Sequence, residues 1–160
     1  MLTVRLICVG KMKERFYIDA FSEYSKRLGA YCRFECTELT ETRLPDPPSQ
    51  KEIDAALEKE AVEINKCIPQ DAYLVAMCVE GSQMSSEKLA ESIARQAISG
   101  RSRLCFVIGG SFGLSPGIKR RADLQLSMSP MTFPHHLARV MLAEQIYRAF
   151  KINEGSRYHK

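Results

Sequence analysis

The stretch Leu104-Cys105-Phe106-Val107-Ile108-Gly109-Gly110 determines the fold class of this chain. Five consecutive apolar residues are typical of a strand that is covered on both faces, and the two glycines end that strand at once. Two further runs of the same kind, Leu2–Val9 and Ala72–Val79, precede it. Segments with helical spacing of apolar residues alternate with these runs. We therefore predict an α/β fold with a mostly parallel sheet flanked by helices.

Turn residues and helix caps place the remaining elements. No repeat, low-complexity tract or linker divides the chain, so we predict a single domain over residues 1–160. A loop is expected at Leu44–Ser49, which is rich in proline, and a turn at Glu80-Gly81-Ser82. The predicted helices are Glu14–Leu28, Ser49 or Gln50 to Ile68, Ser85 or Ser86 to Ser99, about Gly117–Ala122, and Pro134 to about Ile152; two short strands are expected at Arg33–Leu39 and Leu124–Ser127.

Charge is distributed unevenly along the chain. With 160 residues, 45% hydrophobic and 26% charged, the composition is that of a globular protein rather than a disordered or collagen-like one. Residues 1–80 hold 11 Lys and Arg against 14 Asp and Glu, a net charge of −3, whereas residues 81–160 hold 12 against 5, a net charge of +7. A basic half indicates a polyanionic partner, and a chance fluctuation is the alternative.

Other features limit the location and the chemistry of the protein. No apolar run approaches the roughly 20 residues of a membrane span, and the N-terminal apolar stretch is too short for a signal peptide, so we expect a cytoplasmic protein without a membrane partner. The six cysteines form no C-x-x-C pair and are interpreted as structural or incidental thiols in a reducing compartment. His135, His136 and His159 have no carboxylate or thiolate at metal-ligand spacing, so no metal is expected.

Three segments leave predicted strands at their carboxyl ends, where open α/β sheets bind ligands: Met77–Gly81, Ile108–Gly113 and Ser127–Phe133. The glycine spacing in the second segment matches neither a dinucleotide-binding motif nor a P-loop, and on spacing alone a tight structural turn is favoured there. The third segment combines hydroxyl groups with methionines. Such a loop can offer an apolar slot with backbone donors and acceptors to an adenosine-sized ligand, and a plain helix-entry loop is the alternative.

Four segments together resemble one known family: Phe106–Ser111, Met131–His135, Glu144–Phe150 and Tyr158–Lys160. They resemble the corresponding segments of the ribosomal RNA large subunit methyltransferase H (RlmH) family, whose members are bacterial SPOUT-class enzymes. The likeness runs along the whole chain, from Val9-Gly10-Lys11 to the last residue.

The resemblance implies a fold, a cofactor and a partner. It implies a deep trefoil knot in the C-terminal part of the domain, S-adenosylmethionine (SAM) bound in the knot loops, and a homodimer with the site at its interface. It also implies methylation of N3 of a pseudouridine in the large-subunit (23S) rRNA on the assembled ribosome. The family commonly has Leu at position 77, and Pro130 removes one backbone donor from the loop. By position, the implied SAM contacts are Met77, Gly109, Met128, Ser129, Pro130, Met131, Thr132 and Phe133.

Substrate contacts are expected from the last helix and from the C-terminal tail. His135 and Arg139 lie four residues apart, hence on one face of that helix. Arg139 or the tail, through Tyr158 and His159, could stabilise the imide anion that forms on the target base, and His135 or His159 could accept its proton. The basic residues expected to contact rRNA phosphates are Lys119, Arg120, Arg121 and Lys160.

Alternatives to this function remain open at the level of sequence. One keeps the SPOUT fold and changes the substrate to tRNA. A second is a non-catalytic factor that binds the ribosome and would not bind SAM. A small-molecule oxidoreductase is a third, but the chain has no nicotinamide-binding motif to support it.

Overall fold

A computed structural model describes residues 1–160 and contains one five-stranded sheet with the order β2-β1-β4-β3-β5. Every neighbouring pair of strands is parallel. The strands are β1 (Thr3–Val9), β2 (Arg33–Leu39), β3 (Tyr73–Gln83), β4 (Arg103–Ile108) and β5 (Leu124–Ser127). The helices are α1 (Arg15–Leu28), α2 (Gln50–Cys67), α3 (Ser86–Ile98), α4 (Pro116–Arg121) and α5 (His135–Asn153).

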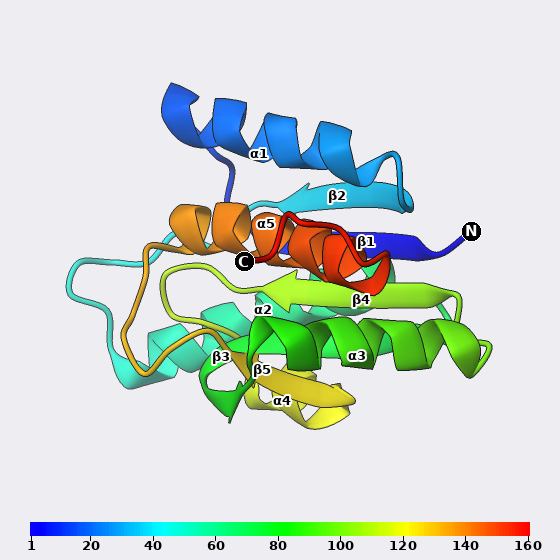
Figure 1. The fold of residues 1–160 in the computed structure, drawn as a ribbon. Coiled ribbons are helices and arrows are strands. Elements are labelled where there is room, and N and C mark those ends of the chain that lie inside the picture. The colour runs from blue at the N-terminus through cyan, green and yellow to red at the C-terminus, as the bar shows by residue number, and fades with distance from the viewer.

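The sheet separates two apolar layers, as Figure 1 shows. Successive side chains of a strand point to opposite faces, so alternate residues of β1 and β4 enter different cores. Leu6 and Phe106 pack in the layer that contains residues of α1, α3 and α5. Ile7 and Val107 pack in the layer that contains residues of α2 and α4. Both layers exclude water from the central strands, which explains why those strands are apolar almost throughout.

The predicted α/β class and the parallel sheet are confirmed. All ten predicted helices and strands are present, and their ends agree within one residue except at the carboxyl end of β3. Ser49 caps α2 by accepting a hydrogen bond from the Glu52 amide, and Ser85 caps α3 in the same way through Lys88. The trefoil knot that the resemblance implies stays a prediction.

The turn predicted at Glu80-Gly81-Ser82 is wrong, because β3 continues through these residues to Gln83. Both Met77 and Ser82 pair with Leu126 of β5, so the residues between them form an irregularity that bulges out of the ladder. The backbone of Gly81 lies so close to β5 that a Cβ atom there would be 2.7 Å from the carbonyl group of Gln125. Glycine therefore allows the second pairing of β3 with β5.

All six cysteines are free thiols; Cys8, Cys32 and Cys105 are buried, and Cys36 is exposed. Burial raises the pKa of the Cys105 thiol to about 12, as expected for a thiol in an apolar layer. In this structure, no helix has both the length and the apolar character needed to cross a membrane.

We expect Gly81→Ala to lower the free energy of unfolding by about 1–3 kcal/mol, since the added methyl group collides with the β5 backbone. Urea denaturation followed by circular dichroism measures this change. Gly117→Ala in α4 is the matched control. The atom nearest to an added Cβ there is Ser115 Oγ at 3.8 Å, an ordinary contact distance, so stability should be unchanged or slightly higher. Equal stability of both variants and the wild type would contradict the close β3–β5 approach.

Candidate functional site

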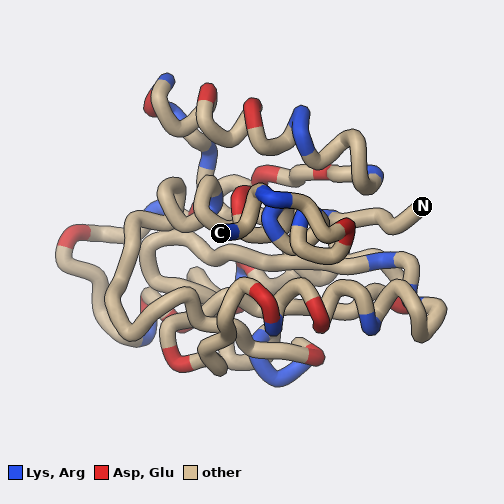
Figure 2. The backbone as a smooth tube through the Cα atoms, in the orientation of Figure 1, with Lys and Arg blue, Asp and Glu red and all other residues tan.

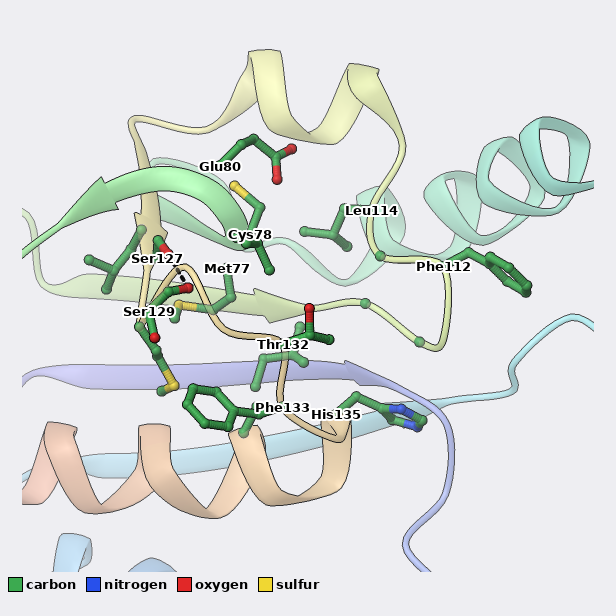
Figure 3. Close-up of a pocket in the computed structure, with 18 of the residues that line it drawn as sticks. Met77, Cys78, Glu80, Phe112, Leu114, Ser127, Ser129, Thr132, Phe133 and His135 are labelled. Atoms are coloured by element: carbon green, nitrogen blue, oxygen red, sulfur yellow. Dashed lines mark hydrogen bonds between the residues drawn. The ribbon is translucent and has the colours of Figure 1, made fainter. Parts of the chain in front are cut away.

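A cavity of about 730 Å³ lies at the carboxyl edge of the sheet. Most of its wall comes from three stretches: residues 77–80 of β3, residues 108–114 at and after the end of β4, and residues 126–135 around the end of β5, of which Pro130 is absent from the lining. Lys119 and Ala138 complete the wall. Figure 3 shows Met77, Thr132 and Phe133 around this space. The three strand exits that the sequence singled out therefore form one cavity.

The glycine turn that follows β4 is one wall of this cavity. Gly110 and Gly113 form an isolated antiparallel bridge, and Gly113 has a φ of +81°. Gly109 packs directly against the backbone of Gly113, and a Cβ on Gly109 would overlap that carbonyl group. The segment is thus a tight structural turn, as its spacing favoured, and it also faces the cavity.

Glu41 holds the turn from outside, and the sequence analysis missed it. Its carboxylate accepts a hydrogen bond of 2.7 Å from the amide of Ser111. A Cβ on Gly110 would lie 2.5 Å from the same oxygen, so only glycine lets the carboxylate approach this closely. Glu41 comes two residues after β2, and it reaches this edge because β2 is parallel to the other strands. Its position just after the predicted strand Arg33–Leu39 is the sequence feature that could have indicated a place at the edge of the site.

The loop between β5 and α5 is ordered by its own serines. Ser127 Oγ donates to the carbonyl oxygen of Ser129 at 3.0 Å, and the amide of Met131 donates to Ser129 Oγ at 3.0 Å. The amides of Met128, Thr132 and Phe133 make no backbone hydrogen bond. Of the eight predicted SAM contacts, seven line the cavity, and Pro130 is exposed outside it. The loop thus combines apolar walls with free backbone donors.

His135 lies at the rim of the cavity, where its ring points away from the centre (Figure 3). The ring packs against the backbone after β1, since a Cβ on Gly10 would lie 3.2 Å from His135 Nε2. Burial lowers the pKa of His135, and the nearby His136 and Arg139 lower it further, against the opposing charges of Glu41 and Glu14. His135 is therefore neutral near pH 7 and able to accept a proton.

Arg139, a predicted substrate contact, lies inside the fold rather than in the wall of the cavity. It is only 1% exposed and is absent from the cavity lining. Its guanidinium donates to Glu38 Oε2 at 2.5 Å and to the carbonyl oxygen of Gly10 at 2.7 Å, which ties α5 to the ends of β1 and β2. Partial burial raises the pKa of Glu38, but the hydrogen bonds from Arg139 and the Met12 amide, together with the charges of Arg139 and Lys11, hold this pKa below its usual value. Two of its guanidinium nitrogens thus bond inside the fold, and the third, Nε, is buried without a hydrogen-bond partner, so the role of Arg139 as a substrate contact stays a prediction.

The C-terminal tail lies against α3 and α5 and does not line the cavity. Tyr158 donates to Glu144 at 3.1 Å, and burial together with this carboxylate raises the pKa of Tyr158 to about 12. His159 lies 3.2 Å from Arg148 and 2.7 Å from Glu87, while Lys160 is exposed. The structure therefore separates the tail from His135.

A second cavity of about 450 Å³ lies between the tail region and the first cavity. Glu144, the partner of Tyr158, lines it. Leu126, Ser127 and Met128 line both cavities, so the end of β5 forms a shared wall. The end of β5 would thus separate a ligand in the first cavity from the second cavity, which Glu144, the partner of Tyr158, lines.

The basic residues of α4 differ in their contacts. Lys119 forms an ion pair with Glu80 and lines the first cavity. Arg121 donates to Asn65 at 2.5 Å, whereas Arg120 is exposed. Figure 2 shows these three basic residues gathered on α4. No group of three or more His, Cys, Asp or Glu side chains is arranged to hold a metal ion.

Comparison with known proteins assigns the family. A family model described as "Predicted SPOUT methyltransferase" matches residues 2–159. Ribosomal RNA large subunit methyltransferase H of Streptococcus pyogenes serotype M5 (strain Manfredo) is 47% identical over 159 residues, which cover 99% of this chain and 100% of the relative. The protein of the same name from serotype M12 (strain MGAS2096) is 46% identical over the same length. The chain belongs to the SPOUT methyltransferase family.

Solved structures agree with a SPOUT methyltransferase fold. A probable methyltransferase from Bordetella pertussis Tohama I has a TM-score of 0.54 at 14% identity, with 91% of this chain and 95% of that chain covered. A structure described as giving insight into 2-OH methylation of C/U34 on tRNA has a TM-score of 0.52, also at 14% identity, with coverage of 96% and 98%. At this identity the likeness concerns the fold alone.

We expect Arg139→Met to cost this SPOUT methyltransferase about 2–3 kcal/mol of stability, because it removes two buried hydrogen bonds from a charged group. Urea denaturation measures the loss. The control is Arg15→Met, which breaks an exposed pair with Asp19 and should cost less than about 0.5 kcal/mol. A variant of Arg139 with wild-type stability and lost methyl transfer would instead restore its role as a substrate contact.

Proposed function

We propose that this protein transfers a methyl group from SAM to N3 of a pseudouridine in large-subunit rRNA on the assembled ribosome. The observation that carries the proposal is the single cavity built from residues 77–80, 108–114 and 126–135 in a chain of the SPOUT methyltransferase family. The near full-length similarity to proteins named ribosomal RNA large subunit methyltransferase H supports the choice of rRNA.

The residues of the cavity fit SAM. Its volume of about 730 Å³ lies within the roughly 300–1,000 Å³ range of small-molecule sites. Met77, Leu126 and Met128 supply apolar wall for a flat base, and the amides of Thr132 and Phe133 are free of backbone hydrogen bonds and available to polar edges. Loss of one donor at Pro130 is tolerated because Pro130 lies outside the cavity. When bound, SAM supplies an electrophilic sulfonium methyl group.

The residues of this chain then have to hold the acceptor base and take its proton. The N3–H of a uracil-like imide is a weak acid, and His135 is the neutral base at the cavity rim. Its ring points toward Gly10 in this structure, so accepting the proton requires a change of its side-chain rotamer. His159 is the other candidate acceptor, held between Arg148 and Glu87.

A homodimer resolves the separation between the tail and the cavity. Tyr158 and His159 are fixed to α5 and α3 of their own chain, outside the cavity lining. A second copy that docks beside the cavity can bring its tail to the base held there, so that two chains complete one site. Arg148, which lies beside His159 of the tail, would then stabilise the imide anion in place of Arg139.

Contacts to the rRNA backbone are assigned to the exposed basic residues. Arg120 and Arg121 lie on the outer side of α4, and Lys160 ends the tail. Such contacts give an affinity that falls with salt, which suits a small enzyme that recognises a ribosome by shape and charge.

Incubation with SAM labelled in the methyl group tests the proposal, with assembled ribosomes, free large subunits and tRNA as substrates. We expect label in the rRNA of assembled ribosomes, mapped to one pseudouridine, and loss of that methyl group in cells lacking the gene. Label in tRNA alone would replace the substrate, and no transfer with no SAM binding would favour a non-catalytic ribosome-binding factor.

The pH dependence of methyl transfer follows from the lowered pKa of His135. A base with a lowered pKa stays unprotonated to lower pH, so the acid limb of kcat/KM should have its midpoint below about 6.5, the value for an unperturbed histidine. His135→Gln should reduce the rate and abolish this limb. Unfolding measured at each pH is the control. Because the pKa of His135 is lower in the folded chain than in the unfolded chain, the free energy of unfolding also decreases as the pH falls below about 6.5. An unchanged limb in His135→Gln would exclude His135 as the proton acceptor.

A further inference from the structure

Lys119 and Glu80 form an ion pair in the wall of the first cavity. Lys119 comes from α4, and Glu80 comes from the bulged end of β3, the segment for which the sequence predicted a turn. The Lys119 side chain is 26% exposed and that of Glu80 is 58% exposed, so both can still meet a ligand. The hydrogen bond from Lys119 lowers the pKa of Glu80, which keeps the carboxylate ionised.

The pair carries the only full charges on the cavity wall. Apart from the titratable His135 and the Cys78 thiol, whose pKa is raised by burial, the other lining side chains are apolar, hydroxyl-bearing or absent, as in the glycine turn. A ligand with a flat apolar part and a zwitterionic part therefore meets two different environments. Its charged end would meet full charges of both signs only near Lys119 and Glu80, where one positive and one negative group lie side by side.

The backbone behind each charged side chain is anchored. Gln125 donates to the carbonyl oxygen of Lys119 at 3.1 Å, and Ser115 caps α4 through the amide of Ile118, whose side chain is buried. Gly81, next to Glu80, packs against the backbone of Gln125. Both residues are thus held to the same strand, β5, and their separation is fixed by the fold.

We propose that Lys119 and Glu80 form the subsite for the amino-acid end of SAM, with Lys119 facing its carboxylate and Glu80 its ammonium group. This proposal rests on the proposed use of SAM. It gives Lys119 a role different from that of its neighbour Arg120, which is exposed on the outer side of α4 and suited to a phosphate.

Two thioethers that share the adenosine part separate the possible roles. S-adenosylhomocysteine carries the amino-acid end, and 5′-methylthioadenosine lacks it. Calorimetry on the wild type, Lys119→Met and Glu80→Gln should show S-adenosylhomocysteine bound about tenfold more weakly by each variant, with the affinity for 5′-methylthioadenosine within about twofold of the wild type. Lys88→Met is the matched control, since it breaks an exposed pair with Glu91 on α3, outside the cavity, and should change neither affinity.

The charge-swapped variant Lys119→Glu/Glu80→Lys separates recognition from a merely structural ion pair. It keeps opposite charges at the two positions, so a structural pair would restore the affinity for S-adenosylhomocysteine, whereas the proposed subsite would not.

Three results would overturn the proposal: equal losses for both thioethers, which would assign the pair to the ribose or to the fold; unchanged affinity for S-adenosylhomocysteine; or full rescue by the swap. A wild type that binds neither SAM nor either thioether would refute the proposed function itself, which is a different outcome.

Discussion

The parallel pairing of β4 with β1 on one side and β3 on the other is the constraint on which the rest of the structure depends. Parallel neighbours require a crossover between them, so each strand is followed by a segment that starts at the same edge of the sheet. Met77–Glu80, the glycine turn and the Met128 loop therefore meet at one edge, although about 50 residues separate the first from the last. Glu41 reaches this edge for the same reason, as the segment that follows β2.

Arg139 connects this edge to the helix that covers it. By bonding to Glu38 and to the Gly10 carbonyl group, it fixes α5 over the ends of β1 and β2 and thereby sets where the loop 128–134 must return. The same helix carries the partners of the tail, Glu144 at its middle and Arg148 in its C-terminal half. One helix thus joins the cavity to the tail, and different parts of it serve different parts of the proposed reaction.

Sequence alone predicted the sheet well because its central strands are apolar on both faces, and β1 and β4 end directly before glycines, at Val9-Gly10 and Ile108-Gly109. It failed at Glu80-Gly81, where a glycine that reads as a turn instead allows close contact with Gln125, a residue far along the chain. The burial of Arg139 and the pairing of Lys119 with Glu80 also depend on long-range packing. Helical spacing placed Arg139 on the same face of α5 as His135. Spacing does not show, however, whether a partner from another element, such as Glu38, lies within hydrogen-bond distance of that face.

We infer that the carboxyl edge of this sheet holds SAM. Amide chemical shifts of the isotopically labelled protein, recorded while SAM is added, test it most directly. Saturable shifts are expected at Met77, at Gly109 and along residues 128–133 except Pro130, which has no amide proton. Shifts confined to the opposite edge, where Arg101 and Arg103 line a polar cavity of about 490 Å³, would contradict it, as would the absence of any shift in the presence of millimolar SAM.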